Sequence, residues 1–270
     1  MTLLVLSGCQ KEASQVERVD FSELVVDTVC PLFKNYDKPS CHISVRLAEP
    51  AETTPDELRR ALLGFVAGLP QESELDETAE GFEQMARSYV RDYVIDYLKE
   101  GPNAIDNYGD DMEAAATWMS YEETVEGRVL YDDKGIVSYQ LRTYSYTGGA
   151  HGNTDTQNGV FDLQTLQPVT LHSLFSEASL HAVGDKMRQR LVEEYACSST
   201  DELETKGLFF DLNELEPNDN FVVTDDSIIW MFDPYEIAPF STGEVHISLP
   251  WTEMQSLLLS DAPVRGMLEI

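Results

Sequence analysis

The spacing of the apolar residues changes along the chain, and this change constrains the fold more than any other feature. Over residues 58–69 and 82–97 apolar residues recur every three or four positions, which is a helical spacing. From Trp118 onward the period changes to two, over residues 118–131 and 136–147, which is typical of half-buried strands. Helices and strands occur in runs rather than in strict alternation, so the pattern favours an α+β fold over a doubly wound parallel sheet.

The predicted strands form an antiparallel β-sheet meander with amphipathic helices packed on it. Residues 24–29 and 42–47 are an N-terminal strand pair, and the turn Asp132-Asp133-Lys134-Gly135 joins the two long strands into a hairpin. Thr54 is expected to cap a helix that begins at Pro55 and ends at Pro70, and Gly101-Pro102 to stop the helix begun near Phe82. The tyrosines of that second helix fit core packing better than a ligand site. Further strands are predicted at 154–163, 169–171, 208–212, 228–232 and 245–249, and further helices at 180–195 and 253–259.

The N-terminus resembles a bacterial lipoprotein leader. An apolar stretch runs into Leu6-Ser7-Gly8-Cys9, which is similar to the site of signal cleavage and acylation. The stretch is too short to span a bilayer and lacks the basic residues of a signal peptide, so we expect a native start further upstream. We predict a lipid on Cys9, a tether over residues 1–19, and two intimately associated subdomains at 20–112 and 113–270, in the bacterial envelope and anchored rather than membrane-spanning.

Charge narrows the range of partners. Asp and Glu number 49 against 18 Lys and Arg, which gives a formal net charge of −31. Phosphate backbones would be repelled, so nucleic acid is excluded as a partner. A basic partner, a cation-rich medium and simple colloidal solubility all remain compatible with this charge.

The cysteines predict one disulfide. Cys30 and Cys41 bracket a turn-rich segment between two predicted strands, and an exported protein can keep such a bridge. Free buried thiols are the alternative, and Cys197 is left over as a packed residue.

Catalytic and metal-binding motifs are absent from the sequence. The five histidines show no zinc-ligand spacing, and neither a nucleophile elbow nor a phosphate-binding glycine loop occurs. The acidic segments 106–111 and 217–220 lack the spacing of an EF-hand and are interpreted as solvated turns. We therefore assign no catalytic residue, no metal and no cofactor.

The segment from Tyr144 to Gly152 is the one candidate recognition loop. Gly148 and Gly149 precede His151, and glycines allow the backbone to take positive φ and to approach another surface closely. A plain hairpin connection with packed tyrosines is the alternative. The candidate ligand-binding residues are Tyr144, Tyr146, Gly148, Gly149, His151 and Tyr235.

Several motifs resemble the RsiV-like family of extracytoplasmic domains of unknown function. They are Tyr146-Thr-Gly-Gly-Ala-His-Gly152, Phe161-Asp-Leu163 with Leu174-Phe175, and the segment from Pro234 to Gly243 with Pro250-Trp251. The chain departs from the family pattern at Leu166, where a turn glycine is expected, at Ser173, where an acid is common, and at Phe240, where tyrosine is usual. Such domains occur in lipoproteins, ahead of a peptidoglycan deacetylase and outside a lysozyme-sensing anti-sigma factor.

The resemblance implies a non-catalytic envelope lipoprotein that binds a wall glycan, such as peptidoglycan, or a basic protein of the lysozyme type. Two alternatives stay open. One is an envelope hydrolase that uses His151 with a nearby carboxylate, and the other is a structural component of a surface assembly.

Overall fold

The computed structural model describes residues 17–68, 81–208 and 215–268. The predicted acylation site at Cys9 lies outside these residues, as does most of the strand predicted at 208–212. Along the described ranges, none of the helices has both the length and the apolar character needed to cross a bilayer.

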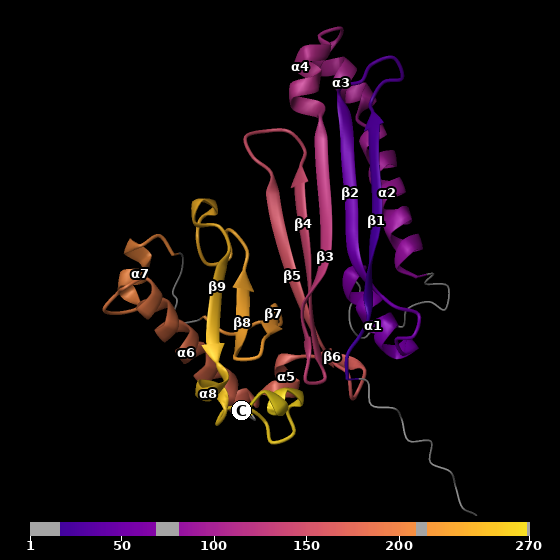
Figure 1. Cartoon of the computed structure of the whole chain (residues 1–270). Helices are drawn as coiled ribbons and strands as arrows, with labels where there is room; N and C mark the ends of the chain where they lie inside the picture. The colour runs from indigo at the N-terminus through magenta and orange to yellow at the C-terminus, as the bar shows by residue number, and fades with distance from the viewer. Residues whose placement is uncertain (1–16, 69–80, 209–214, 269–270) are drawn as a thin grey trace, which may run out of the picture.

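A six-stranded sheet forms the larger layer of the molecule, in the order β1-β2-β3-β4-β5-β6 (Figure 1). All neighbouring strands are antiparallel except β2 and β3, which run parallel. The chain returns to the starting end of β2 through a helical connection, and a parallel pair requires such a crossover. The strands are β1 Phe21–Pro31, β2 Ser40–Pro50, β3 Tyr121–Asp133, β4 Ile136–Tyr146, β5 Asn153–Asp162 and β6 Gln167–Val169.

The β3–β4 hairpin turns as the sequence predicts. Lys134 and Gly135 take φ values of 50° and 77°. Positive φ at both central residues is the signature of a type I′ turn, whose twist matches that of the flanking strands.

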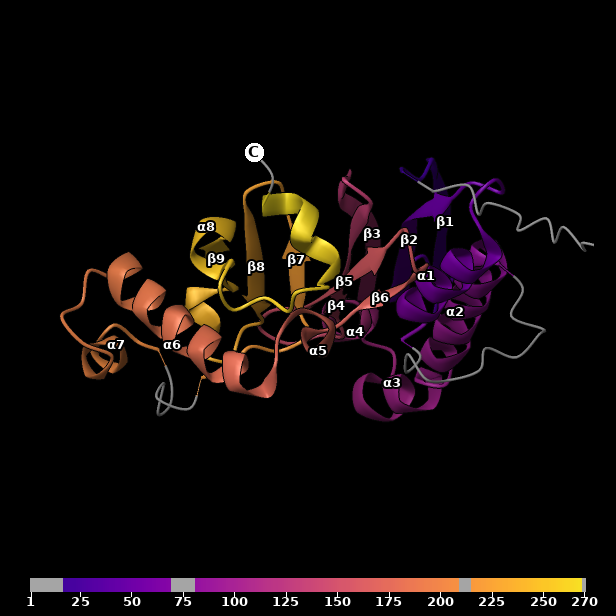
Figure 2. The ribbon, with the colours of Figure 1, turned by 90° about the horizontal axis from the view of Figure 1, so that it is seen from below.

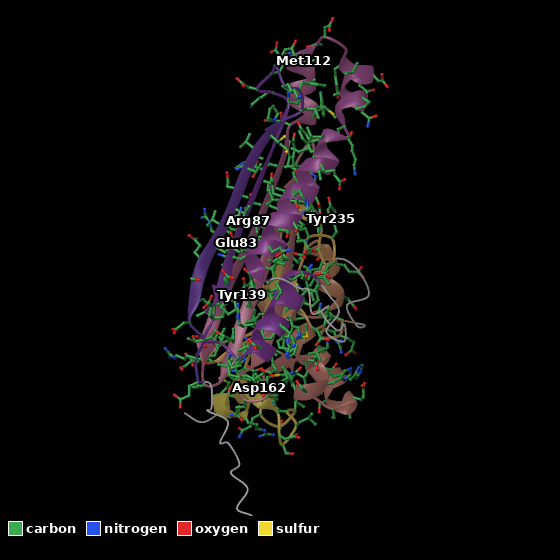
Figure 3. All side chains as sticks on the ribbon, turned by 90° about the vertical axis from the view of Figure 1, so that its right-hand side faces the viewer. Glu83, Arg87, Met112, Tyr139, Asp162 and Tyr235 are labelled. Atoms are coloured by element: carbon green, nitrogen blue, oxygen red, sulfur yellow. The ribbon has the colours of Figure 1, made fainter. Side chains whose placement is uncertain are left out.

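Between β2 and β3 the described residues form four helices, and α2 packs on one face of β1 and β2 (Figures 1 and 2). In α2 the Tyr97 hydroxyl is buried and donates to the Met119 carbonyl at 2.9 Å, in agreement with a core role, whereas Tyr89 of the same predicted stripe is 41% exposed. The ion pair Glu83–Arg87 marks the exposed face of this helix (Figure 3). The helices are α1 Asp56–Val66, α2 Phe82–Leu98, α3 Gly101–Tyr108 and α4 Met112–Met119.

The predicted cap of α1 is wrong, whereas the predicted end of α2 is confirmed. The N-cap of α1 is Pro55, and no side-chain cap is formed there, so Thr54 does not cap the helix. Helix α2 ends at Leu98, just before Gly101-Pro102. A separate helix, α3, begins at Gly101, because proline lacks the N–H that the first turn of a helix leaves unpaired.

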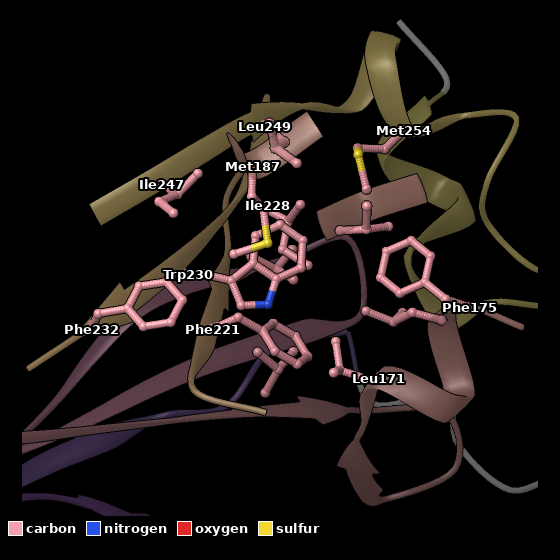
Figure 4. Packing of buried hydrophobic residues seen from close by; sticks show 14 of the residues in the cluster. Leu171, Phe175, Met187, Phe221, Ile228, Trp230, Phe232, Ile247, Leu249 and Met254 are labelled. Atoms are coloured by element: carbon pink, nitrogen blue, oxygen red, sulfur yellow. The ribbon is translucent and has the colours of Figure 1, made fainter. Parts of the chain in front are cut away.

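A second, three-stranded sheet packs across β4 and β5, with α6 on its far side (Figure 2). Trp230, Met187 and Phe175 lie in the core between these elements (Figure 4). The helix predicted at 253–259 is α8, which ends earlier, at Met254. The elements are α5 Leu171–Leu174, α6 Glu177–Glu194, α7 Asp201–Thr205, β7 Phe221–Val223, β8 Ser227–Phe232, η2 Phe240–Thr242, β9 Val245–Pro250, α8 Trp251–Met254 and η3 Pro263–Leu268.

Strand β4 contributes to both cores. Val137 and Tyr139 belong to the core under the helices, and Figure 3 shows Tyr139 within the sheet. Ile136 belongs to the other core, and the neighbouring Ser138 hydroxyl hydrogen-bonds Val223 of β7 at 2.9 Å. The α+β class with two intimately associated subdomains is therefore confirmed. The six-stranded sheet draws strands from both sides of residue 112, and the boundary there stays a prediction.

Candidate binding surface

An open groove lies on the face of β3, β4 and β5 that is turned toward the second sheet. Its volume is about 310 Å³. Glu126 faces Arg142 across one strand pair, and Tyr144 faces a threonine on each side. Because alternate residues of a strand share a face, the period-two pattern places all of these side chains together. The lining residues are Thr124, Glu126, Arg142, Tyr144 and Thr154.

The glycine loop borders this groove. Gly148 and Gly149 have φ values of 88° and 101°, so the positive-φ conformations expected from the sequence are present. A Cβ at Gly152 would lie 2.4 Å from the ring of Tyr144, so glycine is needed for this close approach. The Tyr146 hydroxyl donates to the Gly149 carbonyl at 3.0 Å, which ties the loop to β4.

A stack of three rings stands at the rim. The rings of His151 and Phe240 are 4.1 Å apart between centroids and inclined by 23°, and Tyr235 stacks on Phe240 at 5.9 Å and 30°. Tyr235 is 57% exposed and has a φ of 76°, a left-handed conformation that costs a non-glycine residue energy. The fold thus joins two predicted site residues, His151 and Tyr235, through Phe240, which the sequence marked only as a departure from the family pattern.

Carboxylates line the adjoining edge of β5. The Thr156 N–H donates to both oxygens of Asp233, at 3.1 and 3.0 Å, and its hydroxyl donates to Glu244 at 2.6 Å. Glu244 also lies 3.6 Å from the Arg142 guanidinium and 3.6 Å from the His246 ring. No local sequence pattern marks these residues, because strands distant in the chain bring them together.

Asp233 holds its proton unusually well. Burial raises the pKa of its carboxyl to about 6, and the nearby charges of Asp155, Glu236 and Glu244 add to the rise. The hydrogen bond from the Thr156 N–H acts in the opposite direction but does not outweigh burial. The rim therefore combines exposed aromatic rings with an acidic edge.

The hydrolase alternative requires a carboxylate beside His151. The Nδ1 of His151 hydrogen-bonds the Gly152 carbonyl at 2.9 Å, and one ring face is covered by Phe240. Across the described ranges, no carboxylate forms an ion pair with this histidine. The same ranges hold no cluster of three or more His, Cys, Asp or Glu residues suited to a metal ion.

Cys30 and Cys41 lie directly opposite each other on β1 and β2. Both are free thiols, so the predicted bridge is not formed in this structure, and Cys197 is free as well. Burial raises the pKa of the Cys41 thiol to about 11, which disfavours the thiolate through which disulfides form.

Two family models match parts of this chain. Residues 172–252 match a family model described as a protein of unknown function, DUF3298, and residues 63–154 match a model described as deacetylase PdaC. Residues 172–252 are thus similar to the DUF3298 family. A DUF3298-family protein from Bacteroides fragilis is similar over 93% of this chain and 98% of its own, at 25% identity and a TM-score of 0.79. No curated protein matches.

A second DUF3298-family structure, from Pseudomonas aeruginosa, shares the fold. It covers 90% of this chain and 96% of its own, at 15% identity and a TM-score of 0.57. These findings confirm the predicted family resemblance, and the departures from its pattern have local explanations. Leu166 takes a φ of 60°, as expected where relatives have a turn glycine. Ser173 forms a capping box with Thr170 at the start of α5.

Proposed function

We propose that this protein is an extracytoplasmic binding module, without catalysis of its own, that takes a basic protein on the groove and its aromatic rim. The observation that carries the proposal is the exposed stack of Tyr235, Phe240 and His151 beside the carboxylates of Asp233 and Glu244. A lysozyme-type muramidase is the first candidate ligand.

The two parts of the surface have different physical roles. The net charge of −31 attracts a basic protein over distance and raises its association rate, and salt screens this effect. Charge alone gives indiscriminate adhesion. An exposed ring such as Tyr235 supplies the specific anchor, because an arginine or lysine side chain can stack on its face while nearby carboxylates pair with the cation.

The test compares lysozyme with pancreatic ribonuclease, a basic protein without muramidase activity, across a salt series. Wild type should prefer lysozyme at every salt concentration. Tyr235→Ala should weaken lysozyme binding about tenfold, which corresponds to about 1.4 kcal/mol. The matched control is Tyr36→Ala, which removes an equally exposed ring in the β1–β2 connection and should change nothing. Equal binding of both proteins, erased by salt and unaffected by Tyr235→Ala, would overturn the proposal.

A wall glycan is the second candidate, and the lining of the groove favours it. The hydroxyls of Thr124 and Thr154, the Arg142 guanidinium and the Tyr144 ring provide polar groups and an apolar face, the combination that sugar recognition uses. Calorimetry with soluble peptidoglycan fragments distinguishes a glycan ligand from a basic protein ligand. Heat of binding that is lost in Tyr144→Ala, together with no affinity for lysozyme, would favour the glycan. A purely structural component would respond to neither ligand.

The envelope location rests on the match to deacetylase PdaC and on the sequence around Cys9. Acylation of Cys9 would hold the module at a membrane. With the native upstream region restored, Cys9→Ala should release the protein from the membrane fraction. Unchanged fractionation and an unmodified mature N-terminus would contradict this part of the proposal.

In an oxidising compartment Cys30 and Cys41 would be bridged. Directly opposed residues of an antiparallel pair have Cα atoms about 4.5–5.5 Å apart, within the range that disulfides span. Non-reducing peptide mapping of protein isolated from the envelope should find this linked pair. Two free thiols, or a bridge to Cys197, would contradict the assignment.

A further inference from the structure

The two edges of the six-stranded sheet differ. On the β5 side, the Asp233 carboxylate accepts the Thr156 N–H, and the Asn220 side chain accepts the Asn158 N–H at 2.8 Å. Strand β6 pairs with the far end of β5. On the other side, among the described residues, β1 pairs only with β2. One edge is therefore covered and the other is left open.

The register shows which backbone groups of β1 face outward. The Ala51 N–H donates to the Asp20 carbonyl and the Leu32 N–H to the Pro39 carbonyl, both at 2.8 Å, and no bulge interrupts the pairing between them. Hydrogen-bonded pairs alternate in an antiparallel ladder, so the even-numbered residues bond to β2. The odd-numbered residues turn their N–H and C=O groups away from the sheet, and residues 23, 25, 27 and 29 are all exposed.

Strand β1 carries two acidic side chains, Glu23 and Asp27, but lacks the other features that usually protect an edge. It is 11 residues long, and its one proline, Pro31, is its last residue. It contains no lysine and no bulge. Natural edge strands are commonly short, bulged or charged with lysine to prevent pairing with another chain. Val25 and Val29, exposed by 44% and 62%, instead offer apolar contacts beside the free backbone groups.

The charges on β1 argue against pairing with a second copy of this chain. Glu23 and Asp27 flank Val25 on the same strand face, held by Arg46 at 3.5 Å and His42 at 3.0 Å. A second copy paired antiparallel about Val25 would set Glu23 of one chain against Asp27 of the other, and like charges directly opposite each other are unfavourable.

We propose that β1 is a strand-addition site for an extended segment of another protein in which basic and apolar residues alternate at every second position, so that they share one face of the strand. The main-chain groups of the odd-numbered residues would pair with the incoming strand, its apolar side chains would meet Val25 and Val29, and its basic side chains would meet Glu23 and Asp27. This site lies on the opposite edge of the sheet from the covered edge of β5 and does not depend on the groove function.

The probe is a nine-residue synthetic peptide that carries lysine and valine in turn at every second position, with threonine between them, so that lysines and valines share one face. Its control is the same peptide with alternate backbone nitrogens methylated. Fluorescence polarisation should show at least tenfold weaker binding of the methylated peptide, which cannot complete the ladder. Hydrogen exchange should show at least tenfold slower exchange of the amides of residues 23, 25 and 27 when the unmethylated peptide is bound. Tyr235→Ala should leave both results unchanged.

Two variants test the site from the protein side. Val25→Pro removes one outward N–H and spares the bonds to β2, so it should weaken peptide binding at least tenfold, whereas Val25→Ala keeps the N–H and should change binding less than threefold. If Val25→Pro does not fold, Asp27→Lys reverses an exposed charge and should also weaken binding tenfold. Equal binding of the methylated peptide, amides already protected in the free protein, or dimers in sedimentation that block the peptide would each overturn the proposal.

Discussion

Gly148 and Gly149 follow one another in the same loop but have different surroundings. Both have positive φ, whereas a Cβ on Gly148 would lie 2.3 Å from the Trp118 carbonyl oxygen and one on Gly149 would meet open space. We predict that Gly149→Ala lowers the free energy of unfolding by about 1 kcal/mol, from backbone conformation alone. Gly148→Ala should cost clearly more because it adds a clash with the backbone. Urea unfolding measures both, and equal losses would show that the contact with Trp118 is easily relieved.

Asp233 should make stability depend on pH. Its pKa is raised from 3.8 to about 6, so the folded chain binds this proton more tightly than the unfolded chain. The resulting stabilisation is fully present below the unfolded pKa and is lost as pH rises through the folded one. Asp233→Asn keeps an acceptor for the Thr156 N–H without the charge. At pH 7 it should be more stable than wild type by about 1 kcal/mol after allowance for solvent screening, with the difference vanishing near pH 4.

Asp226 is the matched control for this experiment. Hydrogen bonds from Thr224 and Ser227 lower the pKa of its carboxyl, so its linkage has the opposite sign. Asp226→Asn should therefore be less stable than wild type at neutral pH. If the melting temperature at neutral pH shifts in the same direction for both variants, burial is not the dominant effect on the pKa of Asp233.

Among the secondary-structure elements, Asn220 joins β5 to β8. Its Nδ2 donates to the carbonyls of Thr156 and Met231, at 2.8 and 3.2 Å, and its Oδ1 accepts the Asn158 N–H. Asn220→Ala leaves all three groups without this partner, and we predict a loss of about 2–3 kcal/mol in the free energy of unfolding. The control Asn103→Ala removes one exposed hydrogen bond to Glu100 and should cost less than about 0.5 kcal/mol. Similar midpoints in urea for the two variants would disprove the bridging role.

Residues 217–220 are partly exposed, as expected of a solvated turn, but their polar groups also bond to other elements. The Asn218 carbonyl accepts the indole N–H of Trp230 at 3.0 Å, and the Asp219 carboxylate accepts the Leu171 N–H at 2.8 Å. The polar composition is that of a turn, and only the tertiary structure shows that its groups cap other elements. Composition reports the local preference of a segment and carries no information about distant partners.

Local periodicity predicted the elements whose pattern is regular and long. Helices α2 and α6 follow from spacing alone, because one buried face dictates each pattern. Strand β4 was also predicted, although its first half is buried on both faces. The parallel pairing of β2 with β3 could not be predicted in this way. The alternation of residues between two faces is the same whether a strand runs parallel or antiparallel to its neighbour. The acidic rim was missed for a related reason: Thr156 is 77 residues from Asp233 and 88 from Glu244, and no local pattern encodes those pairings.

The molecule as a whole carries 49 acidic and 18 basic side chains, so the folded chain repels itself. Salt should relieve this repulsion because the Debye length falls from about 10 Å at 0.1 M to about 3 Å at 1 M. We predict that the melting temperature at pH 7 rises steadily as sodium chloride is increased over this range. Calorimetry repeated near the isoelectric point of about 4.2 provides the control, since the rise should largely disappear there. An equal rise at both pH values would assign the effect to something other than net charge.

The parallel pairing of β2 with β3 also affects how fast the chain folds. The β1–β2 and β3–β4 hairpins each close over a short connection, whereas the parallel pair joins strands separated by residues 51–120. Closing a connection of this length costs about 4 kcal/mol of chain entropy by the logarithmic law, and contacts distant in sequence slow folding. We therefore expect the two hairpins to form before they meet, and we expect the alignment of Val45 with Val125 to be the slowest step. Newly made protein would then spend its longest interval with two half-sheets that are not yet joined.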